Sequence, residues 1–404
     1  MNRTFLHTIL FATLLVLSFV PYRVFSTRFL DEGIALILFC MLTTTAIQKR
    51  FLFSIKTFLP FLVVIIVFVV YFIQSAFWGG NTFSAILYDA LVQFKPYVGF
   101  FSVLLLVPHF NEKQRKCLKY ISFIVIAYGL VAAMLGGGVL TGKYYGIWLL
   151  TEHPARFAFL FTICAFIFIW TSEWNKQNIL IFFVILAVGL LSGRSKMYGF
   201  FTFSIFIWLY YFWRKEIHFK KTDLVLIFIA VVSAFIVSYS KIEAYFLNEE
   251  VLKLEYMDSR KVLYSTAFQV ANDNFPLGNG LGSFGTNASI RILSPIYEQY
   301  GIATNTNGKL SICVCDSLFA AILAQFGYLG VCLFFLFWIY ILRKIYLLSV
   351  KNNNNKLFII GISIVAFFII ETFSDSTFTQ NRGLLMMMFL AFIISDLKHK
   401  TKQL

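Results

Sequence analysis

Residues 58–76 of the chain read FLPFLVVIIVFVVYFIQSA, without a single charged residue. About 20 apolar residues are enough for an α-helix to cross the ~30 Å hydrocarbon core of a bilayer. Lipid offers no partner for unpaired backbone groups, and the run is too long and too uniformly apolar for a barrel strand. Because comparable runs recur along the whole chain, the sequence predicts an all-α polytopic membrane protein.

The composition supports this fold class. Of the 404 residues, 59% are hydrophobic and only 13% are charged, whereas soluble domains carry roughly 25% charged residues. The net charge of +15 arises from Lys and Arg residues spread among short loops, and no separable basic domain is present. We therefore attribute the positive charge to membrane insertion and expect no nucleic-acid partner.

We predict twelve transmembrane spans and one long polar segment. Residues 1–240 would hold the first nine spans, residues 241–315 a long loop, and residues 316–404 the last three spans and a short tail. The predicted spans are 5–21, 29–47, 58–76, 83–107, 118–137, 155–172, 178–192, 197–213, 222–240, 316–342, 356–374 and 382–397.

The distribution of basic residues predicts the orientation. With a cytoplasmic N-terminus, most Lys and Arg residues outside the spans fall in cytoplasmic segments, as the positive-inside bias requires. Both termini are then cytoplasmic, and the 241–315 loop lies outside. The first apolar run, residues 5–20, lacks a small-residue cleavage pattern and is expected to be a span rather than a removed signal peptide. The short outer loops hold only Arg23, Arg28, Lys143, Arg156, Arg194, Lys196 and Arg382.

Two outer segments could bind an anion. Ser192-Gly193-Arg194-Ser195-Lys196 is a tight turn with two cations and no acid, suited to a phosphate through the Arg fork and the turn amides. It could equally be a polar turn that keeps two helix ends in water. Arg260 precedes an amphipathic, helix-like stretch, residues 262–271, and could bind an anion or pair locally with Glu255 or Asp258.

A glycine-rich segment follows, PLGNGLGSFG at residues 276–285. Gly280 and Gly282 could present backbone amides to a diphosphate, although the segment lacks the Lys-Ser/Thr ending of a Walker loop and could be a connector. Asp316 opens the tenth span. It could be a helix N-cap or, at the outer mouth of the bundle, a general base.

Other residues in apolar surroundings are Lys95 and most of the cysteines. Lys95 in the fourth span costs about 2.5–3.5 kcal/mol on insertion scales and should face the bundle interior or a wet cavity. Asp89 and Glu371 are candidate partners, between which the sequence does not choose. The six cysteines have no metal-site spacing. Cys313 and Cys315 could form a redox pair but fit two small side chains better, and His153 is expected to be incidental.

Three blocks together resemble the O-antigen ligase/polymerase family of bacterial envelope glycosyltransferases. The Leu191–Lys196 turn resembles that family's Ser/Gly/Arg turn. Arg260 with the later Asn274-Phe275-Pro276-Leu277-Gly278-Asn279-Gly280-Leu281-Gly282-Ser283-Phe284 is similar to its Asn-Pro-Leu-x-Gly-x-Gly-Leu-Gly-x-Phe block. The segment from Asp316 to Gly330 looks like its His-Asn-x-Tyr-Leu…Leu-Gly-x-x-Gly span start. Two departures are Phe275, which interrupts the Asn-Pro step, and Asp316, which stands where ligases have His.

The resemblance implies a GT-C-like fold and glycosyl transfer at the outer face of the bacterial inner membrane. The donor and acceptor would be undecaprenyl-diphosphate-linked oligosaccharides, with a chain-length regulator and a flippase as partners and membrane lipids around the spans. We expect Asp316, Arg194 and Arg260 to be catalytic, and neither a metal nor another cofactor to be required. The expected substrate-binding residues are Lys196, Gly280, Gly282, Lys95 and Arg156.

The absence of the ligase-type His favours a repeat-unit polymerase over an O-antigen ligase acting on lipid A–core. A peptidoglycan polymerase of the shape-and-division type is a further alternative, which the Arg260 and glycine-rich blocks disfavour. A lipid-linked oligosaccharide flippase belongs to another class. It should show paired halves and charges along the spans, whereas this chain concentrates its polar residues in one outer loop.

Overall fold

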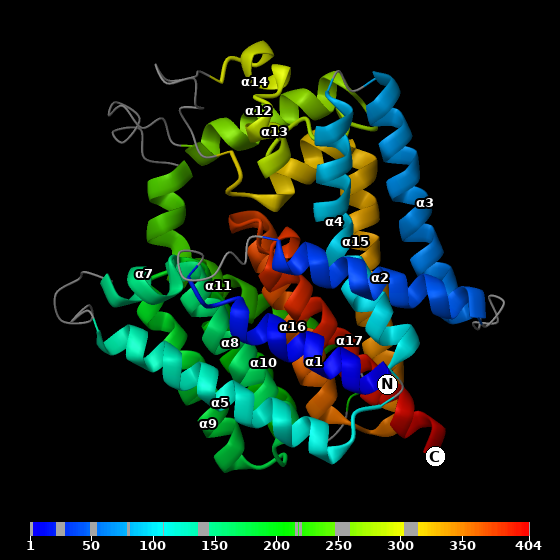
Figure 1. Ribbon diagram of the computed structural model, residues 1–404. Helices are drawn as coiled ribbons and strands as arrows, with labels where there is room; N and C mark the ends of the chain where they lie inside the picture. The colour runs from blue at the N-terminus through cyan, green and yellow to red at the C-terminus, as the bar shows by residue number, and fades with distance from the viewer. Residues whose placement is uncertain are drawn as a thin grey trace.

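The computed structural model describes residues 3–21, 29–48, 55–78, 81–107, 109–135, 145–214, 217, 220–246, 259–302 and 314–403. Every regular element in these ranges is a helix (Figure 1). The all-α fold class is therefore confirmed for the described part of the chain. Lys143, Cys313, Glu255 and Asp258 lie outside the described residues, so the expectations that concern them stay predictions.

Each predicted span overlaps a helix of 13 or more residues. These helices are α1 (Arg3–Leu17), α2 (Leu30–Gln48), α3 (Ile55–Trp78), α4 (Phe83–Leu106), α5 (Glu112–Met134), α8 (Pro154–Thr171), α9 (Lys176–Val188), α10 (Ser195–Trp213), α11 (Lys221–Phe246), α15 (Leu318–Asn352), α16 (Asn355–Ser374) and α17 (Asn381–Gln403). The shorter elements are η1 (Gly189–Ser192), α7 (Tyr145–Thr151), α12 (Ser259–Asp273), α13 (Asn287–Arg291), α14 (Pro295–Gln299) and η3 (Thr377–Thr379).

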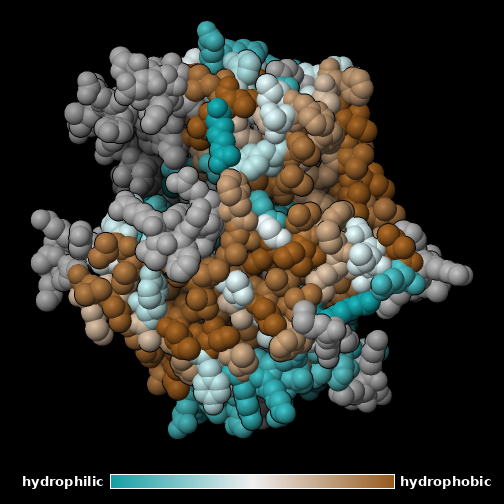
Figure 2. Space-filling view, viewed as in Figure 1, coloured by the Kyte–Doolittle hydropathy of each residue, from teal (hydrophilic) through white to brown (hydrophobic). Residues whose placement is uncertain are grey.

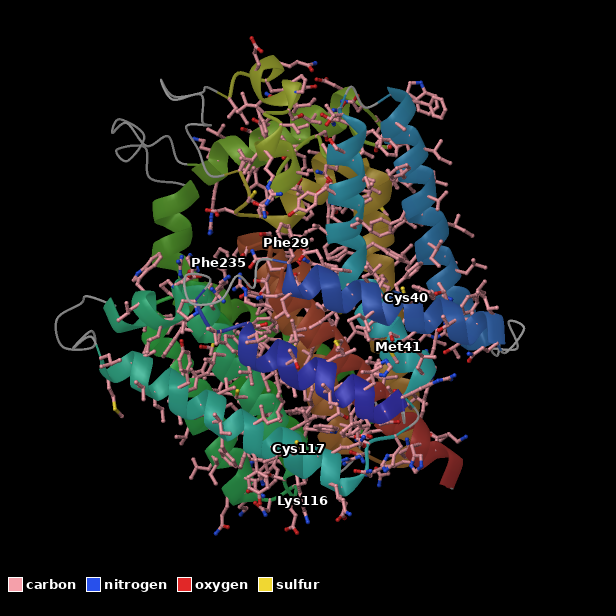
Figure 3. The ribbon with its side chains drawn as sticks, in the orientation of Figure 1. Phe29, Cys40, Met41, Lys116, Cys117 and Phe235 are labelled. Carbon is pink, nitrogen blue, oxygen red and sulfur yellow. The ribbon has the colours of Figure 1, made fainter. Side chains whose placement is uncertain are left out.

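The surface has the pattern of a membrane protein. Among the described residues, 7 helices are long and apolar enough to cross a bilayer, namely α2, α3, α4, α5, α8, α15 and α16. Figure 2 shows hydrophobic residues across the middle of one face and hydrophilic residues gathered at its lower end. Lys116 projects from that end (Figure 3), and both chain termini lie toward it (Figure 1). The helices α12, α13 and α14 lie at the opposite end of the molecule.

The helix α15 is interrupted at Gly327, and the glycine-rich segment packs against this interruption. Gly327 has φ 61°, which ends the regular helix and frees carbonyl groups in the preceding turn. The amide of Asn279 donates to the Ala324 carbonyl at 2.9 Å, and the amide of Gly280 donates to the Gln325 carbonyl at 2.8 Å. The segment therefore satisfies backbone groups that the broken helix leaves without partners.

Close backbone approach explains the glycines at this junction. On the other side of the break, the Leu329 amide donates to the Pro276 carbonyl at 3.2 Å. A Cβ added to Gly327 would lie 2.2 Å from that carbonyl oxygen, and one added to Gly278 would lie 2.4 Å from the Gly327 nitrogen. Both glycines also have positive φ, so any side chain here would clash and strain the backbone.

The described helices between α11 and α15 form a packed layer. The predicted amphipathic stretch is the helix α12, which ends at Asp273. It packs with α14 and the first half of α15 around a second hydrophobic core. This core comprises Leu263, Ala267, Val270, Ala271, Phe284, Ile296, Tyr297, Ile302, Val314, Ala320, Leu323 and Ala324. The described part of the polar segment, residues 259–302, thus forms a layer over the helical bundle (Figure 1), which we call the roof.

Candidate functional site

A polar cavity of about 730 Å³ lies between this roof and the helical bundle. Its walls come from the starts of α2, α8, α10, α12 and α15, from the first half of α4, from α13, and from the connection between α16 and α17. Phe29, at the start of α2, lines it and lies between the two layers in Figure 3. The predicted site residues that line the cavity are Lys95, Arg156, Arg194, Lys196, Arg260 and Asp316. Helix packing brings them together from distant parts of the sequence.

Arg194 reaches the cavity from the predicted turn. Gly193 has φ 64° and closes η1, so the chain reverses and α10 begins at Ser195. The Arg194 Nη2 atom lies 3.0 Å from Nε2 of His153. Burial, together with the charges of Arg194 and Arg382, lowers the pKa of His153 to about 4. Arg194 therefore faces a neutral imidazole at neutral pH, and His153, for which the sequence indicated no role, lines the cavity beside it.

Lys196 binds to two carboxylates. Its Nζ lies 2.7 Å from Glu371 Oε2 and 2.6 Å from Asp375 Oδ2. Arg382 lies 3.6 Å from the other Asp375 oxygen. Although burial opposes ionisation, Lys196 and Arg382 hold the pKa of Asp375 below its usual range. Lys196 thus joins α10 to the end of α16, and its charge is largely compensated within the protein.

Arg260 fixes the roof to the bundle. Its Nη2 donates to the carbonyl of Ser374 at 3.2 Å. One turn further along α12, the Tyr264 hydroxyl donates to the Phe373 carbonyl at 2.7 Å. The first turn of α12 is therefore held against the end of α16, next to Asp375, with the Arg260 side chain at the cavity wall.

Asp316 is not the N-cap of α15. The cap is Ser317, whose Oγ accepts a hydrogen bond from the Ala320 amide at 3.3 Å. The cap interpretation was wrong by one residue, because Asp and Ser are equally good caps in sequence. Asp316 is half-buried and lines the cavity. Ser317 also lies 2.9 Å from the Tyr264 hydroxyl, which places Asp316 near the Arg260 helix.

Lys95 and Arg156 line the cavity but also hold the bundle together. Lys95 forms ion pairs with Asp31 and Glu32 of α2, so neither Asp89 nor Glu371 is its partner, contrary to the sequence prediction. Arg156 Nη1 lies 2.8 Å from Glu152, and its Nε donates to the Ser18 carbonyl at 3.1 Å. Lys95 therefore connects α2 with α4, and Arg156 connects the end of α1 with α8.

The role predicted for Gly280 and Gly282 is not supported. The Gly280 amide donates to the Gln325 carbonyl at the break in α15, and the Gly282 amide donates to Asp89 Oδ2 at 2.7 Å. Neither glycine lines the cavity. Asp89 also accepts from Gln93 at 2.9 Å, so this buried carboxylate holds the glycine-rich segment on α4. The segment supports the roof instead of presenting amides to a ligand.

Sequence reasoning missed several cavity residues. Asp375 and Arg382 follow α16, and Tyr88 and Arg291 face each other from α4 and α13. Arg382 was visible as one of the few cations in an outer loop, but nothing in the sequence showed its neighbours. Among the described residues, no group of three or more His, Cys, Asp or Glu side chains is placed to hold a metal ion.

An apolar groove of about 380 Å³ adjoins the polar cavity. It runs between α3, α4 and the part of α15 from Leu318 to Tyr340. The cavity and the groove share Gln93, Leu318 and Thr379 in their walls. The apolar side chains of the groove include Val63, Val67, Phe68, Tyr97, Ile322, Phe326, Leu333, Phe334 and Phe337. The polar cavity, which is rich in cations, and the apolar groove therefore meet at one wall.

Comparison of the chain with family models and with curated proteins gave no match. The functional conclusion therefore rests on the geometry of the cavity and on the three motif blocks described above.

Proposed function

We propose that this membrane protein is a glycosyltransferase that polymerises polyprenyl-diphosphate-linked oligosaccharide repeat units into a surface polysaccharide. The reaction would take place at the outer face of the bacterial inner membrane. The donor and the acceptor would both be lipid-linked units, as the resemblance to the O-antigen ligase/polymerase family implies.

The observation that carries the proposal is the junction of the cationic cavity with the apolar groove. A lipid diphosphate has a strongly charged head and a long apolar tail, and the two halves of the site match these two parts. Arg194 and Arg260 line the cavity with guanidinium groups, which bind diphosphate oxygens in a bidentate manner. The groove wall is made of aliphatic and aromatic side chains from three helices. A soluble nucleotide sugar has no long apolar tail that could occupy such a groove.

The chemistry requires a base, an acceptor hydroxyl and a stabilised leaving group. The hydroxyl oxygen attacks the anomeric carbon of the donor sugar, and its proton passes to the Asp316 carboxylate. The bond between the anomeric carbon and the diphosphate oxygen breaks at the same centre. The negative charge that develops on the departing lipid diphosphate is stabilised by Arg194 and Arg260. Asp316 later releases its proton to water.

The experiment that tests the function uses the native host. Deletion of the coding region should replace the ladder of long surface glycans on a gel with a band of single repeat units. Loss of all capped lipid A–core, including the single-unit band, would indicate a ligase instead. Purified protein in proteoliposomes should extend lipid-linked units in one compartment, and movement of units across the bilayer without chain growth would indicate a flippase.

A further inference from the structure

Arg291 differs from the other cations of the cavity. It is exposed at the end of α13, and its guanidinium carbon lies 4.9 Å from the centroid of the Tyr88 ring on α4. The other lining cations contact carboxylates, carbonyl groups or an imidazole. In the described part of the chain, Arg291 has no carboxylate within ion-pair distance. Its one described side-chain contact is therefore an aromatic face.

This contact leaves the guanidinium able to bind an anionic ligand. Stacking on an aromatic ring uses the face of the guanidinium group and leaves the N–H groups in its plane available to donate. A carboxylate accepts two such hydrogen bonds in a planar, bidentate arrangement. Tyr88 thus restricts the orientation of Arg291 without neutralising its charge.

The position of Arg291 associates it with the acceptor rather than with the diphosphate. Asn287, on the same short helix, lies 3.7 Å from the sulfur of Cys315, the residue before Asp316. Both Asn287 and Cys315 line the cavity. Arg194 and Arg260, in contrast, are fixed to His153 and to the end of α16. Arg291 therefore belongs to the wall beside the proposed base.

We propose that Arg291, held by Tyr88, binds the carboxylate of an acidic sugar in the acceptor repeat unit. The proposal rests on the proposed function, because it takes the acceptor hydroxyl to lie at Asp316. Arg291 is then a specificity-determining residue, and a repeat unit with a carboxylate is used in preference to the same unit without it.

The test uses full-length protein in proteoliposomes and lipid-linked repeat units extracted from the native host. Half of the preparation is treated so that sugar carboxylates are reduced to primary alcohols. Arg291→Gln should raise the apparent KM for the untreated units about 10- to 100-fold, the range expected for losing charged hydrogen bonds. The same variant should change the KM for the reduced units less than about twofold.

Arg343→Gln is the matched control, because Arg343 is an exposed arginine on α15 outside the cavity. It should leave the KM for both forms unchanged. Equal slowing of both forms by Arg291→Gln, or native units that contain no carboxylate, would overturn the proposal while chain growth by wild type upholds the proposed function. No chain growth by wild type on either form would overturn both.

Discussion

Replacing Asp316 with Asn is expected to lower the rate of chain growth about 10²–10⁴-fold, the usual contribution of a general base. Asn has the shape of Asp but no basic lone pair to accept the hydroxyl proton. The structure also predicts a small effect on folding. The N-cap of α15 is Ser317, and Asp316 lies half-buried one residue before it. A substitution of this kind, away from core and caps, usually changes stability by no more than about 0.5 kcal/mol.

The assay measures the initial rate at which membranes that contain equal amounts of each variant extend lipid-linked repeat units. The matched control is Asp273→Asn. Asp273 lies in the same roof but outside the cavity, where it accepts a hydrogen bond from the Tyr300 hydroxyl at 2.8 Å. The amide oxygen of Asn can still accept that bond, so this variant should extend chains at the wild-type rate.

Near-normal chain growth by Asp316→Asn at matched protein level would refute the base role. Asp375 would then be a poor substitute, because Lys196 and Arg382 hold its pKa low and make it a weak base. A large loss of folded protein in the same variant would contradict the expectation that Asp316 contributes little to folding. Activity at matched protein level therefore tests the base role of Asp316, and protein level tests its role in folding.

Three further predictions concern binding, folding and topology. Arg194→Ala and Arg260→Ala should each abolish the glycan ladder at normal protein level, and the Lys variants should restore little of it, because a point charge cannot replace a bidentate fork; wild-type ladders would exclude them from the diphosphate site. Gly327→Ala should lower the yield and Tm of purified protein, whereas Gly33→Ala, where an added Cβ meets nothing within 4 Å, should not; equal Tm values would contradict the proposed close packing. A reporter fused after Lys261 should be active outside the cell and one at the C-terminus inside, and an inside signal at Lys261 would exclude an outer site.

The helices could be predicted from sequence because their signal is local. A run such as residues 58–76 has only one low-energy arrangement in lipid, and the structure has α3 there. The amphipathic stretch after Arg260 likewise became α12. Boundaries were less certain, since Asp316 and Ser317 are both good caps and only the backbone geometry distinguishes them.

The partners of buried charges could not be predicted. Lys95 pairs with Asp31 and Glu32, which lie on a different helix, because the packing of α2 on α4 places them there. Gly282 appeared suited to a ligand, yet its amide is used by Asp89. Sequence identified which residues are costly to bury, but the pairing depends on helix packing over the whole chain.

Two lysines and two arginines have different roles in the cavity wall. Lys95 and Lys196 each lie between two carboxylates, so they connect pairs of helices and contribute little net charge to the cavity. Arg194 faces a neutral imidazole, and Arg291 faces an aromatic ring. The carboxylates thus neutralise the lysines that fix the walls, whereas these two arginines keep their charge. The positive field of the cavity therefore comes from side chains with the geometry to bind a diphosphate or a carboxylate.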